Sequence, residues 1–276
     1  MAGALQWSEQ SLAQPPGRTG DEYVHVRSLA RPASFRQPSL RQASLLAFHG
    51  VLFDWRGTLV VCPTVEGVVA EALRRLGRPA DRSTVGELAT RLERARDDLD
   101  APGMDADAAL HRSTYLRVLA DLGLDPELVG ELYEVESDPG YNPFADDAAP
   151  TLRALRNAGL RIGVVSDIHV DIRPAFASAG LEDAVDVFTL SFEQGVQKPD
   201  PAMFTRTLTA LGIGPDEALR VGDRSRPDGA AVELGIATLL LPPLARRTER
   251  RLHHVTALCG AARWTAVSHT GDNVPL

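Results

Sequence analysis

A short apolar run near residue 50 that ends in an aspartate most constrains what this chain can fold into. Residues 51–53 are continuously hydrophobic and lead into Asp54 and then Gly57. Continuous hydrophobicity is typical of a parallel strand that is buried on both faces. We therefore expect Asp54 at the carboxyl end of a strand, the edge of an open α/β sheet where ligands bind. The alternative is an ordinary strand and turn, in which Asp54 is only a turn residue.

From residue 148 onward, helical and strand patterns alternate along the chain. This alternation predicts a parallel sheet with crossover helices. We therefore predict an α/β fold with a Rossmann-like parallel sheet and helices on both of its faces. Further strands are expected at 161–165, 184–190, 219–221 and 237–241.

A helical region separates the first strand from the alternating part of the chain. Its apolar residues recur at helical spacing, which predicts amphipathic helices that form a small inserted bundle. Thr84 and Glu87 form a capping-box pattern at the second helix, and Asp125 precedes a proline at the fourth. The third helix carries His111 and Tyr115, which we interpret as bundle core or surface rather than substrate contacts. The expected helices cover 64–76, 85–99, 105–122 and a segment that begins at 126.

These patterns divide the chain into four parts. Residues 1–46 are rich in Ser, Gln, Pro, Ala and Arg without periodicity, and we expect a disordered arm. Residues 47–61 and 142–243 are predicted to form the α/β core, and residues 62–141 the helical insertion. Residues 244–276 are predicted to be a short basic helix, from 246 to 258, and a loose tail.

Composition excludes several classes of protein. The net charge of −8 and the pI of about 5.4 give no basic footprint for nucleic acid or an anionic membrane. No run approaches the roughly 20 apolar residues of a membrane helix, and the first residues lack the pattern of a secretory signal. Cys62 and Cys259 fit no metal or redox spacing, so we expect free thiols in a reducing, cytoplasmic compartment.

Polar side chains follow successive predicted strands where each strand ends. They are Asp54, Ser166, Lys198 and Asp223, and Lys198 is the only lysine in the chain. Because parallel strands end at one edge of a sheet, these side chains are expected to meet. Two carboxylates suit Mg²⁺, while a hydroxyl and an ammonium suit the oxygens of a phosphoryl group. An aspartate can also act as a nucleophile that forms an aspartyl-phosphate.

In this arrangement of motifs the chain resembles the haloacid dehalogenase (HAD) superfamily between about residues 50 and 243. The first motif corresponds to Phe53-Asp54-x-x-Gly57-Thr58-Leu59, and the second to the strand that ends in Ser166. The third corresponds to Gly195-x-x-Lys198-Pro199-Asp200-Pro201, and the fourth to Val221-Gly222-Asp223 with Asp228 five residues on.

The resemblance implies a role for each matched residue. Asp54 would be the nucleophile and a metal ligand, together with the main-chain oxygen of Arg56. Asp223 would anchor the Mg²⁺ with Asp228 in support. Ser166 and Lys198 would bind the phosphoryl oxygens and steady the nucleophile. The helical insertion would be the small α-helical cap of the family, which closes over the active site.

Arg56 departs from the pattern of the family's phosphatases. They carry a second aspartate at this position, which protonates the leaving group and then activates water. A guanidinium stays protonated and cannot do so. Arg56 is expected either to bind a substrate carboxylate or phosphate, or to pair with a carboxylate of the protein. Asp167, His169 or a group from the cap could replace the missing acid. His169 could contact the substrate at the mouth of the site. We favour the alternative, in which His169 lies on the surface at the start of a helix.

The branches of the family can be weighed at the same motif. Dehalogenases usually have an aromatic residue at position 56 and lack the fourth motif, which argues against dehalogenation. Trp55 fits the phosphonate-cleaving branch, but that branch needs a cap lysine, and residues 62–141 contain none. Phosphotransferase members of the family also carry the aspartate that Arg56 replaces here, so this branch is no better a match.

The sequence therefore predicts a Mg²⁺-dependent phosphatase of a small phosphorylated metabolite, monomeric or homodimeric, without nucleic-acid or membrane partners. The alternative is a catalytically weak HAD-like protein that binds a ligand or regulates, because Arg56 replaces the acid/base aspartate. The substrate itself is not encoded in the fold.

Overall fold

The structure is a computed structural model, and it describes residues 48–99 and 101–261. The predicted arm at 1–46 and the predicted tail beyond residue 261 lie outside the described residues. None of the helices in the described part is both long and apolar enough to cross a membrane.

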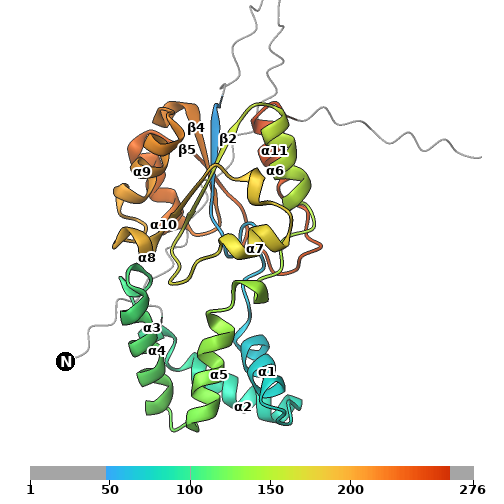
Figure 1. Cartoon of the computed structure of the whole chain (residues 1–276), viewed down its shortest axis with the longest axis vertical. Coiled ribbons are helices and arrows are strands. Elements are labelled where there is room, and N and C mark those ends of the chain that lie inside the picture. Colours follow the sequence, from blue (N-terminus) through green and yellow to red (C-terminus); the bar gives the residue numbers. More distant parts are fainter. Residues whose placement is uncertain (1–47, 100, 262–276) are drawn as a thin grey trace, which may run out of the picture. The chain divides into compact units, whose positions relative to one another are not determined.

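Five parallel strands form one sheet at the centre of the core (Figure 1). Their spatial order is β3-β2-β1-β4-β5, so β1 lies in the middle. Phe53, the last residue of β1, is in register with Val164 on one side and Val221 on the other. The predicted Rossmann-like parallel sheet is therefore confirmed. The strands are β1 (Gly50–Phe53), β2 (Arg161–Ser166), β3 (Val187–Leu190), β4 (Ala218–Gly222) and β5 (Ala237–Leu240).

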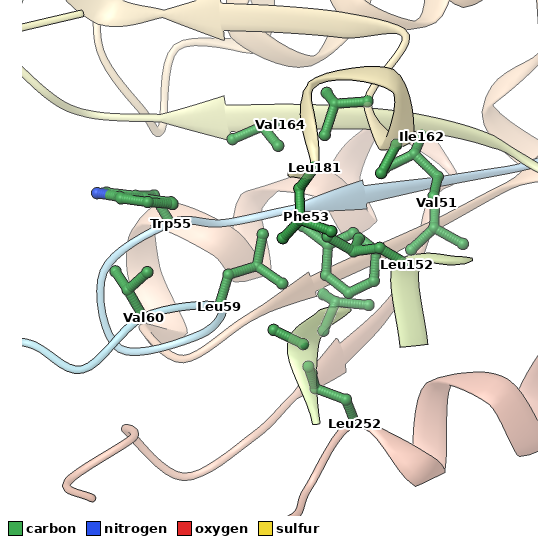
Figure 2. Packing of buried hydrophobic residues seen from close by; sticks show 14 of the residues in the cluster. Val51, Phe53, Trp55, Leu59, Val60, Leu152, Ile162, Val164, Leu181 and Leu252 are labelled. Carbon is green, nitrogen blue, oxygen red and sulfur yellow. The ribbon is translucent and has the colours of Figure 1, made fainter. Parts of the chain in front are cut away.

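Helices cover both faces of this sheet, as predicted. Successive side chains of a strand point to opposite faces, so Val51 and Phe53 of β1 enter one hydrophobic cluster and Leu52 enters another. Figure 2 shows Phe53 among Leu152, Ile162 and other buried apolar side chains of the first cluster. The core helices are α6 (Ala148–Asn157), α7 (Arg173–Ser178), α8 (Ser191–Gln194), α9 (Pro201–Leu211), α10 (Ser225–Gly229) and α11 (His253–Leu258).

Short 3₁₀ turns connect several of these elements. They are η1 (Met104–Ala106), η2 (Pro139–Tyr141), η3 (Glu182–Ala184), η4 (Pro215–Glu217) and η5 (Ala230–Leu234).

The helical insertion lies beyond the carboxyl ends of the strands (Figure 1). It has a hydrophobic cluster of its own, which includes Val69, Leu73, Leu119 and Leu132. Each of these four side chains is at least 97% buried, so the insertion has its own small core. Its helices are α1 (Val65–Arg75), α2 (Arg82–Glu93), α3 (Arg96–Leu99), α4 (Ala108–Asp121) and α5 (Pro126–Glu136).

Helix ends differ from the predictions where another side chain supplies the cap. Helix α2 begins after Asp81, whose carboxylate accepts from the main-chain N–H groups of Ser83 and Thr84. The predicted cap at Thr84 is therefore wrong, because an aspartate three residues earlier satisfies these donors. The third predicted helix begins at Ala108, after its N-cap Asp107. The last helix begins at His253 rather than 246, because the main-chain N–H groups just before it bond to Asp147.

The two connections between core and insertion lie side by side. Val60 and Phe144 form an antiparallel bridge, and the main-chain N–H of Val61 donates to the oxygen of Pro143 at 3.0 Å. The N–H of Ala145 donates to the oxygen of Leu59 at 2.9 Å. The segments through which the chain enters and leaves the insertion are thus hydrogen-bonded to each other next to the end of β1.

Candidate active site

The ends of β1 and β4 bring carboxylate oxygens of Asp54 and Asp223 within 4.8 Å of each other. The main-chain N–H of Asp54 donates to the oxygen of Val221 at 2.8 Å, which continues the strand pairing to the site. Gly57 has φ of +77°, and a Cβ at this position would overlap the Asp223 carboxylate. Only glycine accommodates both this positive φ and the close approach of the Asp223 carboxylate without strain. The predicted glycine turn thus lets the loop after β1 pack against Asp223.

Lys198 lies at the centre of a buried network of charges. Its Nζ lies 2.5 Å from Oδ1 of Asp54 and 2.7 Å from Oδ1 of Asp228. Arg220, in β4, donates to the same Asp228 oxygen at 2.5 Å and lies 3.5 Å from Oδ1 of Asp54. The side chains of Lys198, Asp228 and Arg220 are fully buried. Two cations and two carboxylates therefore neutralise one another beneath the strand ends.

Burial and these pairings shift the pKa values of the network. Burial alone would lower the pKa of Lys198, but Asp54 and the neighbouring aspartates raise it above its ordinary value. Burial opposes ionisation of Asp228, yet Lys198 and Arg220 hold its pKa far below the usual range. Burial and the nearby Asp54 and Asp228 carboxylates raise the pKa of Asp223 to about 6. Asp223 is thus the carboxylate of the set that most needs an additional cation to stay ionised.

The carboxylate oxygens of Asp54, Asp223 and Asp228 include atoms within 4.8 Å of one another, a spacing that suits a shared cation. Oδ1 of Asp223 is buried without a hydrogen-bond partner among the described residues. A buried carboxylate oxygen without a donor is costly, and a hard divalent cation would satisfy it. Asp228 differs, because its oxygens already accept from Lys198, Arg220 and the main-chain N–H groups of Asp223 and Arg224.

Ser166 and Asp167 follow β2 on the other side of Asp54. Ser166 is 98% buried at the strand end. Its hydroxyl has only a long contact, 3.5 Å, to the oxygen of Asp167. Asp167 accepts from the main-chain N–H of Lys198 at 2.7 Å and from Arg224 at 3.1 Å. Burial raises the pKa of Asp167 despite the nearby Lys198.

Arg56 pairs with a carboxylate of the insertion, one of the two alternatives that the sequence left open. Its guanidinium donates to the carboxylate and, at 2.8 Å, to the main-chain oxygen of Glu136. Its Nε donates to Oδ1 of Asn142 at 2.8 Å. Burial would lower the pKa of Arg56, but Glu136 raises it overall. Arg56 thus joins the end of β1 to the exit of the insertion.

A cavity of about 380 Å³ lies between the strand ends and the insertion. Asp54, Arg56, Ser166, Asp167 and Asp223 line it from the core, so it contains five of the predicted site residues. The insertion contributes apolar and charged side chains of α1, α2 and α3 to the lining of the cavity. They are Val65, Val68, Leu92, Leu99, Glu93 and Arg96.

The remaining predicted site residues lie outside the cavity lining. Lys198 and Asp228 lie beneath the cavity. Lys198 donates to Asp54, and Asp228 accepts from the main-chain N–H of Asp223. His169 is 97% buried, so the interpretation that placed it on a helix-start surface is wrong. It lies against the insertion, where its ring stacks on His111. His111 and Tyr115 are buried in the insertion, which agrees with a place in its core, but both also line the cavity, so the alternative of a substrate contact stays open.

Sequence reasoning missed three residues of this region. Arg220 interrupts an apolar strand, and a charge at a buried strand position was a signal that could have found it. Asp105 and Glu136 line the cavity from the insertion, but nothing in the local pattern separates them from the other acidic residues of the helices.

A family model described as haloacid dehalogenase-like hydrolase matches residues 48–233, more than half of the chain. The chain belongs to the haloacid dehalogenase-like hydrolase family.

Individual relatives are phosphatases by name. A phosphoserine phosphatase from Thermus thermophilus is 31% identical over 133 residues, 46% of this chain and 53% of that protein. This chain therefore spans about half the length of that relative. A ribulose-1,5-bisphosphate 5-phosphatase from Halopiger xanaduensis is 29% identical over 208 residues, 70% of this chain and 84% of that protein.

Among solved structures, a HAD phosphatase from Thermococcus onnurineus matches with a TM-score of 0.54 and 23% identity. The match covers 78% of this chain and all of that one. At this identity it establishes the shared fold.

Proposed function

We propose that this protein is a Mg²⁺-dependent phosphatase that acts on a small phosphate ester through an aspartyl-phosphate on Asp54. The observation that carries the proposal is the pairing of Asp54 with Lys198 beside an unpartnered oxygen of Asp223. The names of the phosphatase relatives support the reaction class.

In this proposal Asp54 attacks the phosphorus atom through its second carboxylate oxygen. A bond forms between that oxygen and phosphorus, while the bond from phosphorus to the leaving oxygen breaks and its electrons go to the leaving group. Lys198 holds Oδ1 of Asp54, which fixes the orientation of the attacking oxygen. Asp228 and Arg220 fix Lys198 in turn. Water then attacks the phosphorus, releases phosphate and restores the Asp54 carboxylate.

The residues that would hold the cation are Asp54, Asp223 and the main-chain oxygen of Arg56. The unpartnered Oδ1 of Asp223 fits this assignment. We assign Asp228 to a supporting position, because both of its oxygens already accept hydrogen bonds. When bound, Mg²⁺ would offset the negative charge that the carboxylates and the phosphoryl oxygens bring together.

The leaving group receives no proton from residue 56. The Arg56 guanidinium stays charged and is held by Glu136. General acid help is worth about 10²–10⁴-fold in rate, so we expect good activity only for leaving groups that are stable as anions. Ser166 and Lys198 are proposed to contact the phosphoryl oxygens, and Asp167 and His169 remain candidates for substrate contact or proton transfer.

The helical insertion is proposed to act as the cap, and its side chains to select the leaving group. The cavity lies between the insertion and the strand ends and has an apolar wall. A small phosphorylated molecule fits a space of about 380 Å³. A cytoplasmic location is part of the proposal, and the two free cysteines support it. Monomer or homodimer remains a prediction.

Hydrolysis of p-nitrophenyl phosphate tests the proposal, because its leaving group needs little protonation. We expect turnover that requires Mg²⁺ and disappears in Asp54→Asn. Asp216→Asn, an exposed aspartate of η4, should retain wild-type turnover as the matched control.

One observation favours a second function, a HAD-like protein that binds a ligand without turnover: Arg56 occupies the acid position and is committed to Glu136. Equal rates for wild type and Asp54→Asn would select this second function.

A further inference from the structure

A second cluster of metal-ligating side chains lies outside the aspartate network. Oδ1 of Asp105 lies 3.4 Å from Nδ1 of His169 and 3.9 Å from Nε2 of His111. One ligand atom from each of the three residues lies within 4.8 Å of the others. Asp105 and His111 belong to the insertion, in η1 and α4, whereas His169 follows β2 in the core. The cluster therefore spans the junction between the two parts.

The imidazole of His111 is buried and makes no hydrogen bond to the described residues. Its side chain is only 6% exposed, its Nδ1 is fully enclosed without a partner, and its Nε2 is too far from Asp105 for a hydrogen bond. Burying a polar ring in this way costs free energy that a ligand bond would recover. When Nδ1 carries the proton, Nε2 and the Asp105 carboxylate 3.9 Å away both offer electron pairs, and a cation between them would partner both.

His169 is held in the orientation that a metal-ligating histidine requires. Its Nε2 lies 3.1 Å from the hydroxyl of Ser137, and this contact directs its Nδ1 toward Asp105. Metal-bound histidines usually use their second nitrogen in this way. Because Ser137 follows α5 at the exit of the insertion, the contact also links the ring to the segment that leads from the insertion back to the core.

Asp105 is fixed across the junction by its main chain. Its oxygen accepts from the hydroxyl of Ser191 at 2.6 Å. The main-chain N–H groups of Gly103 and Asp105 donate to Oε1 of Gln197 at 3.0 and 3.3 Å. Both partners belong to the core, and Gln197 precedes Lys198. The core therefore positions the Asp105 carboxylate next to the histidines.

We infer that Asp105, His111 and His169 form a second cation site that takes a borderline transition metal such as Zn²⁺. Two imidazoles and one carboxylate are donors that zinc prefers, whereas the all-oxygen set at Asp223 suits Mg²⁺. The two rings stack at 3.4 Å between centroids with 6° between their planes, so binding requires the His111 ring to turn toward the ion while Ser137 holds His169. Asp105 and His111 line the cavity, which leaves room for water or a ligand as a further donor.

A cation at this site would hold the insertion against the core. Two of its ligands come from one part and the third from the other, so the ion would cross-link them beside the substrate cavity. This role is independent of turnover at Asp54, and it is measurable whether or not the protein is a phosphatase.

Zinc binding in the presence of excess Mg²⁺ tests the inference. Equilibrium dialysis of the full chain followed by elemental analysis should show about one retained Zn²⁺ per wild-type chain. His111→Gln and His169→Gln should each weaken this binding at least about 100-fold, since a direct ligand matters more than its supporting partner. His253→Gln/His254→Gln removes the adjacent histidines of α11 and should behave as wild type.

The melting temperature gives a second readout. Zn²⁺ should raise the melting temperature of the wild type and of the α11 control, but not that of His111→Gln. Asp105→Asn keeps both rings, so it reports on the site even where a histidine variant folds poorly, and it too should lose the rise. Equal zinc retention in wild type, His111→Gln and Asp105→Asn would overturn the inference, as would loss of zinc in the α11 control.

Discussion

The guanidinium of Arg56 donates to both the carboxylate and the main-chain oxygen of Glu136, at 2.8 Å for the latter. Arg56 follows the central strand, and Glu136 is the last residue of α5. Residue 56, at which the resemblance leads us to expect an acid/base aspartate, therefore joins core and insertion in this chain.

Breaking this pair should destabilise the protein. Both side chains are about one-fifth exposed, so Glu136→Gln leaves a mostly buried guanidinium with a weaker partner. We expect the free energy of unfolding to fall by about 1–3 kcal/mol, as measured by urea denaturation. Glu134→Gln removes an exposed carboxylate 3.5 Å from Arg112 and should change it by less than about 0.5 kcal/mol. Equal losses in the two variants would contradict a structural role for the Arg56 pair.

Restoring a carboxylate at position 56 should change which leaving groups react. The double variant Arg56→Asp/Glu136→Gln avoids repulsion between two carboxylates. We expect its kcat/KM for alkyl phosphates to rise at least about 10-fold relative to p-nitrophenyl phosphate, because only the poor leaving group needs the proton. The comparison uses Glu136→Gln alone as its control. An unchanged ratio would mean that residue 56 does not face the leaving group.

Arg220 should be essential for stability although it lies outside the cavity lining. Arg220→Met leaves Lys198 as the only side chain that pairs with Asp228 in the buried network, and carbonyl oxygens of Leu52 and Val165 lose their contacts at 3.4 and 3.3 Å. Removing one member of a buried charge network costs about 3–5 kcal/mol. Arg206→Met, which alters a surface arginine bonded to Gln194, is the control. Similar melting temperatures for the two variants would refute this assignment.

The two cysteines should report differently on ligand binding. Cys62 lines the cavity, while burial raises the pKa of Cys259 to about 11, away from it. Phosphate with Mg²⁺ should slow alkylation of Cys62 by iodoacetamide severalfold and leave the slow reaction of Cys259 unchanged. Peptide mass spectrometry follows each thiol separately. Unaltered labelling of Cys62 at saturating phosphate would place the ligand elsewhere.

The fold was predictable because its signals are local. Continuous hydrophobicity marks β1, and Asp125 with Pro126 marks the start of α5 where the structure has it. At the carboxyl edge of the sheet, the residue after β1 and the loop after α8 then bring Asp54 and Lys198 into contact. Local patterns failed where competing caps exist, as at Asp81 and Thr84.

Contacts between core and insertion were not predictable from local patterns. The partner of Arg56 lies 80 residues away in sequence, and Asp105 reaches His169 through the packing of η1 on the core. Such pairings depend on how the insertion packs against the core. A charged residue inside an apolar strand, Arg220, is the one missed feature that the sequence itself displayed.

A single turnover reveals whether Asp54 becomes phosphorylated. The wild type would be mixed with a limiting amount of p-nitrophenyl phosphate and Mg²⁺, quenched in acid within milliseconds, and digested for mass spectrometry. We expect a transient gain of one phosphoryl group on the peptide that contains Asp54, and none in Asp54→Asn. Substrate turnover without any phosphorylated Asp54 peptide would contradict it.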